Sequence, residues 1–239
     1  MSRRSKKNRS SNNRLIGLDS RSTDLKKIFP MTPAQDKVFS SFEQGNHLFL
    51  HGVAGTGKTF VSLYLALNEL LSKRSMYREI QIIRSVVPTR DMGFLPGTEK
   101  QKTESYEAPY KTIVNELFQC GTAYESLRKT NLINFSSTSF IRGQTFYDSI
   151  IIVDECQNMN FHELDSVITR IGDNCLIIFC GDFRQSDFRW EDEKNGIKEF
   201  MKIIRKMSQF SFIEFGQEDI VRSALVKDYI INKLELGIA

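Results

Sequence analysis

The segment that most constrains this chain runs from Gly52 to Thr59 and reads Gly-Val-Ala-Gly-Thr-Gly-Lys-Thr. It matches the phosphate-binding pattern G-x-x-x-x-G-K-[ST] at every fixed position, between an apolar run at 48–50 and an apolar helical pattern at 60–71. Glycines let backbone N–H groups turn inward around a polyphosphate, and the N-terminus of the next helix adds a positive dipole end. A ligand-free Gly-rich turn is the alternative, but the strand–loop–helix context favours a nucleoside-triphosphate site.

We call this segment the phosphate loop. Its residues are the candidate nucleotide ligands: Gly52, Val53, Ala54, Gly55, Thr56, Gly57, Lys58 and Thr59. Lys58 is expected to reach the β- and γ-phosphates, where its charge would also count in catalysis. Thr59 is expected to place its hydroxyl on Mg²⁺.

Two adjacent carboxylates follow a second apolar run, the β-branched segment at 149–153. Such a run is typical of a buried parallel strand, and ligands of open α/β sheets bind at the carboxyl ends of the strands. We expect Asp154 to hold Mg²⁺ through water and Glu155 to orient and deprotonate an attacking water. The pair could instead be surface acids that cap the next helix. In a chain with a phosphate loop, Glu155 favours a hydrolase over a passive nucleotide binder.

Two glutamines are further candidates for nucleotide contacts. Gln185 ends a G-D-x-x-Q element after the apolar run at 175–180, where its amide could detect the γ-phosphate; a simple turn is the alternative. Gln35 lies in a helix that begins with a Thr cap and Pro33, 17 residues before Gly52. It could read the adenine edge or could be an exposed amide on a helix face, and the sequence leaves both open.

Strand and helix patterns alternate along the chain, which predicts one α/β domain with a mainly parallel sheet and helices on both faces. We expect a basic disordered tail at 1–14, an extension at 15–30 and the domain at 31–239. The tail carries six basic residues and no acid, so a net charge of +4 leaves the remainder at −2. It could be an arm for nucleic acid or only a solubilising terminus. The absence of a long apolar run or a signal-peptide pattern predicts a cytoplasmic protein without a membrane partner.

Taken together, the motifs resemble the PhoH-like ATPases, a RecA-like P-loop group associated with phosphate starvation and related to superfamily 1 helicases. The matching segments are Thr32 to Gln35, Gly52 to Thr59, Gly93 to Gly97, Ile141 to Thr145, Val153 to Asn158, Gly181 to Gln185 and Asp219 to Arg222. The resemblance implies an ATPase that uses Mg²⁺, binds single-stranded RNA or DNA and forms an oligomer, with a hexameric ring expected. Departures such as Ser85 in place of the usual Pro put coupling and partner contacts in doubt more than ATP binding.

The same resemblance suggests Arg222 as a transition-state arginine, which is expected to come from a neighbouring copy because the chain has one RecA-like domain. An Arg222–Asp219 pair is the alternative. Arg142 is a second candidate for that role or for a nucleic-acid contact.

Basic and aromatic residues are interleaved in the stretch from Met92 to Pro109, which we expect to be an irregular excursion. Lys100, Lys102 and Tyr106 could bind a single strand by phosphate contacts and stacking, or the stretch could pack on a neighbouring subunit.

The functional hypothesis is therefore an oligomeric Mg²⁺-dependent ATPase that couples hydrolysis to binding, translocation on or unwinding of single-stranded nucleic acid. The main alternative is a nucleotide-gated RNA-binding or scaffold protein that hydrolyses slowly and does not translocate. A small-molecule kinase shares the phosphate loop, but the element ending at Gln185 argues against that class.

Overall fold

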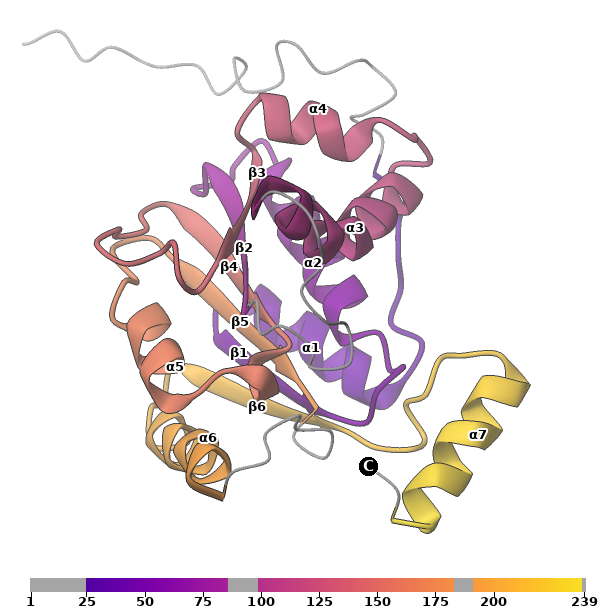
Figure 1. The fold of residues 1–239 in the computed structure, drawn as a ribbon. Helices are drawn as coiled ribbons and strands as arrows, with labels where there is room; N and C mark the ends of the chain where they lie inside the picture. Colours follow the sequence, from indigo (N-terminus) through magenta and orange to yellow (C-terminus); the bar gives the residue numbers. More distant parts are fainter. Residues whose placement is uncertain (1–24, 86–98, 183–190, 238–239) are drawn as a thin grey trace, which may run out of the picture.

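The fold is built on one sheet of six parallel strands, seen in a computed structural model that describes residues 25–85, 99–182 and 191–237. The strands lie in the order β3-β2-β4-β5-β1-β6 (Figure 1). They are β1 (His47–Gly52), β2 (Glu79–Arg84), β3 (Ile133–Ser137), β4 (Ser149–Asp154), β5 (Leu176–Gly181) and β6 (Phe210–Phe215). Because all pairs are parallel, the carboxyl ends of the strands meet at one edge of the sheet.

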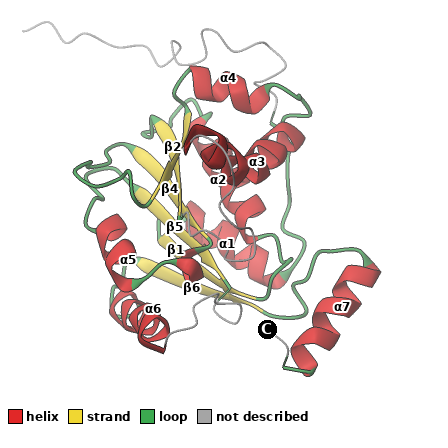
Figure 2. Ribbon diagram, viewed as in Figure 1, coloured by secondary structure: helices red, strands yellow, loops and turns green. Residues whose placement is uncertain are grey.

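Helices cover both faces of this sheet (Figure 2). They are α1 (Pro33–Glu43), α2 (Lys58–Leu70), α3 (Glu99–Leu117), α4 (Ala123–Lys129), α5 (Phe161–Ile168), α6 (Glu191–Ile204) and α7 (Ala224–Glu235), with a short 3₁₀ turn η3 (Cys156–Asn158). Helices α1 to α4 pack in one apolar cluster, and α5 and α6 pack in the other. The predicted α/β class with helices on both faces is confirmed.

The alternating direction of side chains along the strands explains why two cores form. In β4, Ile150 and Ile152 belong to the cluster with α2, whereas Ile151 and Val153 belong to the cluster with α5. Successive side chains of a strand point to opposite faces, so a continuous apolar run fills both cores when both faces are covered. The uninterrupted apolar runs of the sequence therefore belong to central strands.

Helix α3 corrects one expectation from the sequence. The stretch from Met92 to Pro109 was expected to be irregular, but residues 99–109 form the first half of α3 and Pro109 lies inside the helix; residues 92–98 lie outside the described residues. A proline removes one backbone hydrogen bond and strains the preceding turn, yet a helix survives this when its neighbours favour the conformation. Here the segment 99–108 is rich in Glu, Lys, Gln and Ala, which are such residues.

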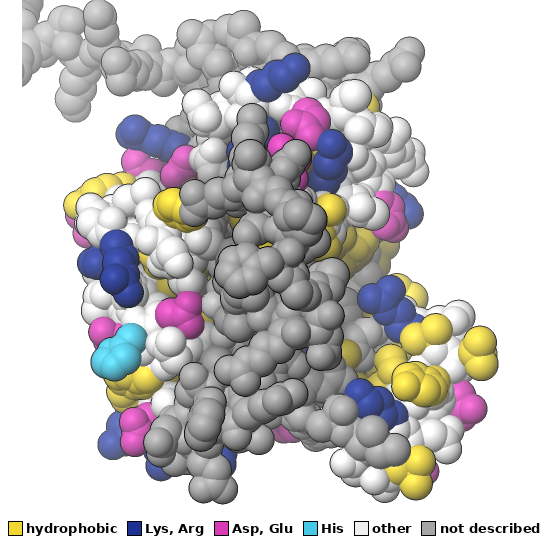
Figure 3. Space-filling model, in the orientation of Figure 1, with side chains coloured by type: hydrophobic (Ala, Val, Ile, Leu, Met, Phe, Trp, Pro, Cys, Tyr) yellow, Lys and Arg dark blue, Asp and Glu magenta, His cyan; other side chains and the backbone are white. Residues whose placement is uncertain are grey.

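Helix α7 stands apart from the two cores. None of its described side chains is buried, and Leu225, Tyr229 and the following Leu236 are exposed. Figure 3 shows hydrophobic side chains gathered on this helix at the lower right. Within the described ranges, no helix is long and apolar enough to span a membrane.

Candidate nucleotide site

The phosphate loop joins β1 to α2 in a conformation that requires its glycines. Gly52 has φ +124°, and a Cβ added there would lie 2.1 Å from the carbonyl oxygen of Phe215 on β6. Gly57, with φ +82°, stands directly before the first turn of α2. Only glycine adopts such angles without strain, so the loop can curve closely around a ligand at the N-terminus of α2.

Lys58 lies inside the curve of the loop. Its Nζ donates to the carbonyl oxygens of Gly52 at 3.0 Å and Val53 at 2.8 Å, and to Oγ1 of Thr56 at 3.4 Å. Burial lowers the pKa of Lys58, and the charges of Asp182, Cys180, Glu155 and Asp154 oppose that shift. The ammonium group is thus held in the loop by acceptors that phosphate oxygens could replace.

Thr59 and Asp154 meet across the site. The Thr59 hydroxyl donates to Oδ1 of Asp154 at 2.8 Å, although the residues come from α2 and β4. Burial, and then the charge of Glu155, raises the pKa of Asp154, whereas hydrogen bonds from Thr59 and Tyr110 lower it. The donor set of a hydroxyl and a carboxylate suits Mg²⁺, which prefers oxygen ligands, so these two residues fit the predicted metal site.

Glu155 occupies an unusual backbone position at the end of β4. Its φ of +51° places it in the left-handed region, which is uncommon for a residue other than glycine. Nε2 of Gln157 donates to Oε2 of Glu155, and the backbone N–H of Asp182 donates to Oε1 of Gln157 at 3.1 Å. Gln157 therefore links the proposed base to the end of β5.

Gln35 is buried beside the phosphate loop rather than exposed on a helix face. Its Nε2 donates to the carbonyl oxygen of Thr56 at 3.0 Å, and its Oε1 accepts from the backbone N–H of Met31 at 2.8 Å. The surface alternative for Gln35 is thereby wrong, because the side chain is 3 % exposed. Its role in reading adenine stays a prediction.

Arg222 lies against the phosphate loop of its own chain. A Cβ added to Gly55 would be 3.1 Å from Cγ of Arg222, and the backbone N–H of Val221 donates to the carbonyl oxygen of Gly55 at 3.1 Å. Asp219 accepts hydrogen bonds from the backbone N–H groups of Ala34 and Gly216. Asp219 thus serves to anchor α1 and the segment after β6, and Arg222 projects from that segment with an exposed side chain.

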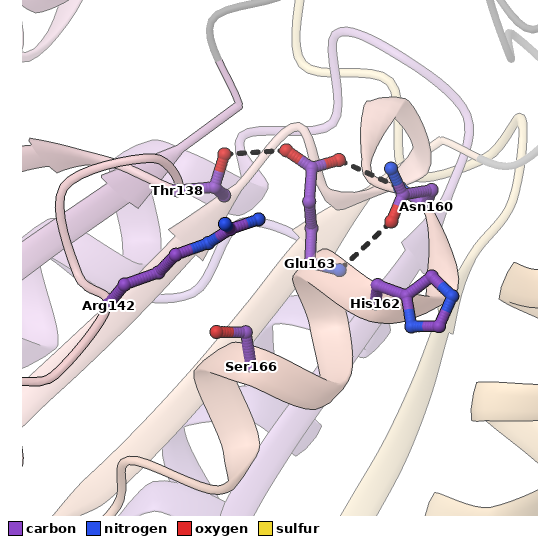
Figure 4. Close-up of a pocket in the computed structure, with 6 residues that line it drawn as sticks. All are labelled: Thr138, Arg142, Asn160, His162, Glu163 and Ser166. Carbon is purple, nitrogen blue, oxygen red and sulfur yellow. Dashed lines mark hydrogen bonds between the residues drawn. The ribbon is translucent and has the colours of Figure 1, made fainter.

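The residues predicted to contact nucleic acid lie in different surroundings. Arg142 lines a pocket of about 420 Å³ between the end of β3 and α5. In Figure 4 its side chain extends toward Glu163, whose carboxylate accepts a hydrogen bond from Thr138. Tyr106 is half-buried, with the guanidinium of Arg84 5.6 Å from its ring centroid. Lys100 and Lys102 belong to the first part of α3, whose side chains the structure does not describe. Gln185 lies outside the described residues altogether.

Several contacts at this edge of the sheet have no counterpart among the sequence predictions. The Tyr110 hydroxyl donates to Oδ2 of Asp154 at 2.9 Å. Ser85, where the resemblance leads one to expect proline, donates its hydroxyl to Glu163 at 3.0 Å. Gln157 could have been found from the sequence, because it stands two residues after Glu155 in a recognisable motif. No sequence motif links Tyr110 to the site, since 44 residues separate it from Asp154.

Comparison with known proteins agrees with the motifs. The family model described as PhoH-like protein matches residues 27–234. Protein PhoH of Escherichia coli K12 is 30% identical over 212 residues, covering 88% of this chain and 59% of that protein. A PhoH-like protein of Bacillus subtilis is 29% identical over 206 residues, covering 86% of this chain and 63% of that protein. The chain thus spans about six tenths of the length of these relatives.

Two solved helicase structures are also similar to this chain. The Pif1 helicase from Candida albicans matches with a TM-score of 0.36 and 15% identity, over 79% of this chain and 40% of that one. Bacteroides Pif1 bound to ssDNA matches with a TM-score of 0.43 and 11% identity, over 89% of this chain and 47% of that one. The family match covers most of the chain, including the phosphate loop and the Asp154–Glu155 pair. This chain belongs to the PhoH-like protein family.

Proposed function

We propose that this chain is a Mg²⁺-dependent ATP hydrolase that acts with single-stranded nucleic acid. One observation carries the first half: the phosphate loop, the Thr59–Asp154 pair and Glu155 meet at the carboxyl edge of the sheet. The combination of residues supports this function more strongly than any one of them. Triphosphate hydrolysis requires a phosphate-loop lysine, a hydroxyl and a carboxylate that hold the metal, and a residue that positions the attacking water.

Each residue has a distinct part in the proposed reaction. Lys58 would exchange its backbone acceptors for phosphate oxygens and stabilise the charge that develops on the γ-phosphate. Thr59 and Asp154 would hold Mg²⁺, which supplies neutralisation of the phosphate charge when bound. Glu155, held by Gln157, would orient the attacking water and accept its proton. Gln35 and Gln185 stay proposed contacts to the base and the γ-phosphate.

Glu155→Gln tests the hydrolysis. The substitution keeps the size of the side chain and removes the group that accepts the proton, so phosphate release should fall at least a hundredfold. Nucleotide binding, measured with a fluorescent ATP analogue, should remain, because Glu155 is not a proposed phosphate ligand. Equal rates of phosphate release in the two proteins would contradict the assignment of Glu155 and of the hydrolase.

The nucleic-acid half of the proposal is supported by the position of Arg142. Its exposed side chain lines the pocket beside Glu163, and Glu163 accepts hydrogen bonds from residues that follow both β2 and β3. A single strand of RNA or DNA bound in this pocket would lie at the same edge of the sheet as the nucleotide. Arg142→Ala should weaken binding of single-stranded RNA or DNA and reduce the salt dependence of that binding.

Stimulation of ATP hydrolysis by nucleic acid distinguishes a translocating or unwinding ATPase from the alternative. ATP hydrolysis that rises with single-stranded RNA or DNA, together with displacement of a paired strand, supports translocation or unwinding. Nucleotide-dependent RNA binding without stimulation would support a gated binding or scaffold protein. An oligomer, with a ring as the expected form, is part of the proposal and is measured as mass in solution with ATP analogue and oligonucleotide.

A further inference from the structure

The carboxylate of Asp154 is held from two helices at once. Thr59, on α2, donates to Oδ1 at 2.8 Å, and Tyr110, on α3, donates to Oδ2 at 2.9 Å. Asp154 is 5 % exposed and Tyr110 is fully buried, so water competes little for the bond between them. The orientation of the carboxylate is therefore set by α3 as much as by the helix that follows the phosphate loop.

The Tyr110 hydroxyl is not needed for packing. The ring lies in the core, 5.7 Å from the ring of Phe135 on β3, where a phenylalanine would fill the same space. A buried hydroxyl costs free energy unless it has a hydrogen-bond partner. Here the Tyr110 hydroxyl donates to the acid proposed to hold the metal and is also hydrogen-bonded with the side chain of Arg84. Arg84, at the end of β2, adds a positive charge that acts on both Tyr110 and Asp154.

We propose that Tyr110 is a positioning residue for the metal-holding carboxylate, so that α3 is a functional part of the nucleotide site. This inference rests on the proposed function, because it assigns a partner to the acid that would hold Mg²⁺. Groups that hydrogen-bond a metal-binding carboxylate fix its orientation, and their loss typically weakens metal affinity 10- to 100-fold. Tyr110 acts through Asp154 and has no contact with the nucleotide in this proposal.

A matched pair of substitutions isolates the hydroxyl. Tyr110→Phe removes one oxygen next to the site, and Tyr124→Phe removes the corresponding oxygen of another buried tyrosine, which donates to Glu107 away from the site. Both variants keep the ring and its packing. Thermal unfolding of each reports the structural effect of losing a buried hydrogen bond.

Binding of a fluorescent ATP analogue, titrated with Mg²⁺ and repeated in EDTA, provides a readout apart from activity. In Tyr110→Phe the Mg²⁺ concentration that gives half of the maximal change in analogue binding should rise about tenfold. The dissociation constant in EDTA should be that of the wild type, and Tyr124→Phe should match the wild type in both conditions.

Three results would overturn the assignment of Tyr110: an unchanged Mg²⁺ titration, an equal loss of affinity in Mg²⁺ and EDTA, or an equal shift in Tyr124→Phe. A wild-type protein that binds the analogue with no dependence on Mg²⁺ is a different outcome. It would contradict the proposed function itself, so the two failures are distinguishable.

Discussion

Glu155 shows how a single residue can be held in an unfavourable conformation at the proposed site. A left-handed backbone costs a non-glycine residue about 1–2 kcal/mol, and such strain persists only where the surroundings hold it. Here η3 follows directly, and Gln157 binds both the Glu155 carboxylate and the backbone N–H of Asp182. Gly181 permits this packing, because a Cβ added there would lie 2.7 Å from Sγ of Cys156 and 2.9 Å from Oε1 of Gln157.

Gln157→Ala should therefore lower turnover without weakening nucleotide binding. Glu155 would keep its carboxylate but lose the donor that orients it, so we expect phosphate release to fall about tenfold. Gln81→Ala is the control, because Gln81 is also buried and donates to a side chain, Ser136, outside the site. Similar rates in Gln157→Ala and Gln81→Ala would show that Gln157 is only structural.

The sequence could predict those site residues that are carried by contiguous motifs. The phosphate loop and the Asp154–Glu155 pair were found because each needs a strand before it and a fixed order of residues. Tyr110 could not be found in that way, since its bond to Asp154 depends on how α3 packs on the sheet. Gln35 shows an intermediate case: its motif was visible, but its burial against Thr56 depends on the packing of α1.

Among the elements, β1 and β6 pair in parallel, and Gly52 of β1 lies opposite Phe215 of β6. The backbone N–H of Val53 donates to the carbonyl oxygen of Phe215 at 3.0 Å, and a Cβ on Gly52 would meet that same oxygen at 2.1 Å. The phosphate loop can leave β1 at this angle only because no side chain stands between the strands.

Gly52→Ala should destabilise the fold, because one of the two strands must shift to admit the methyl group. We expect the free energy of unfolding in urea to fall by about 3 kcal/mol, the upper range for overpacking. Gly45→Ala is the matched control: Gly45 also has a positive φ, but nothing lies within 4 Å of an added Cβ. That variant should lose only about 1 kcal/mol from the backbone strain. Equal losses would show that the close approach of β6 is unimportant.

His47, at the amino end of β1, gives the same element a pH dependence. Burial lowers the pKa of His47 from 6.5, and its Nδ1 accepts a hydrogen bond from the backbone N–H of Ile177 at 3.3 Å. The unfolded chain therefore binds a proton more readily than the folded one, so stability should fall as the pH drops through 6.5. Urea unfolding at pH 7.5 and 5.5 should show a smaller difference for His47→Gln than for the wild type. His162→Gln, at an exposed position on α5, should keep the wild-type difference.

Helix α3 is the element whose first half the sequence did not predict, and Tyr110 was missed with it. Pro109 and the neighbouring glycines and prolines favoured an irregular excursion, yet the helix runs through Pro109. The next residue is Tyr110, whose direction toward Asp154 depends on that continuous helix. The parallel strands, in contrast, were predictable because buried apolar runs specify them regardless of the loops between them.

At the scale of the whole molecule, the sheet brings the ends of distant segments to one edge. The segment after β6 covers the phosphate loop from outside, where Val221 is bonded to Gly55 and Arg222 lies next to it. An arginine in this position needs no second copy to stand near a nucleotide. The sequence predicted delivery from a neighbour, and that prediction is still open.

Mixing of inactive variants decides between the two arrangements. We expect Arg222→Ala to lower hydrolysis about a thousandfold, as loss of a transition-state arginine does. If Arg222 serves its own chain, a mixture of Arg222→Ala and Lys58→Ala subunits should release phosphate no faster than the two proteins separately, since no subunit has both residues. Arg78→Ala, which removes an exposed arginine paired with Asp148, should retain wild-type activity. The mass of the mixture in solution must show that subunits assemble; rescue in an assembled mixture would establish delivery between copies, because only a shared site could then combine an intact Lys58 with an intact Arg222.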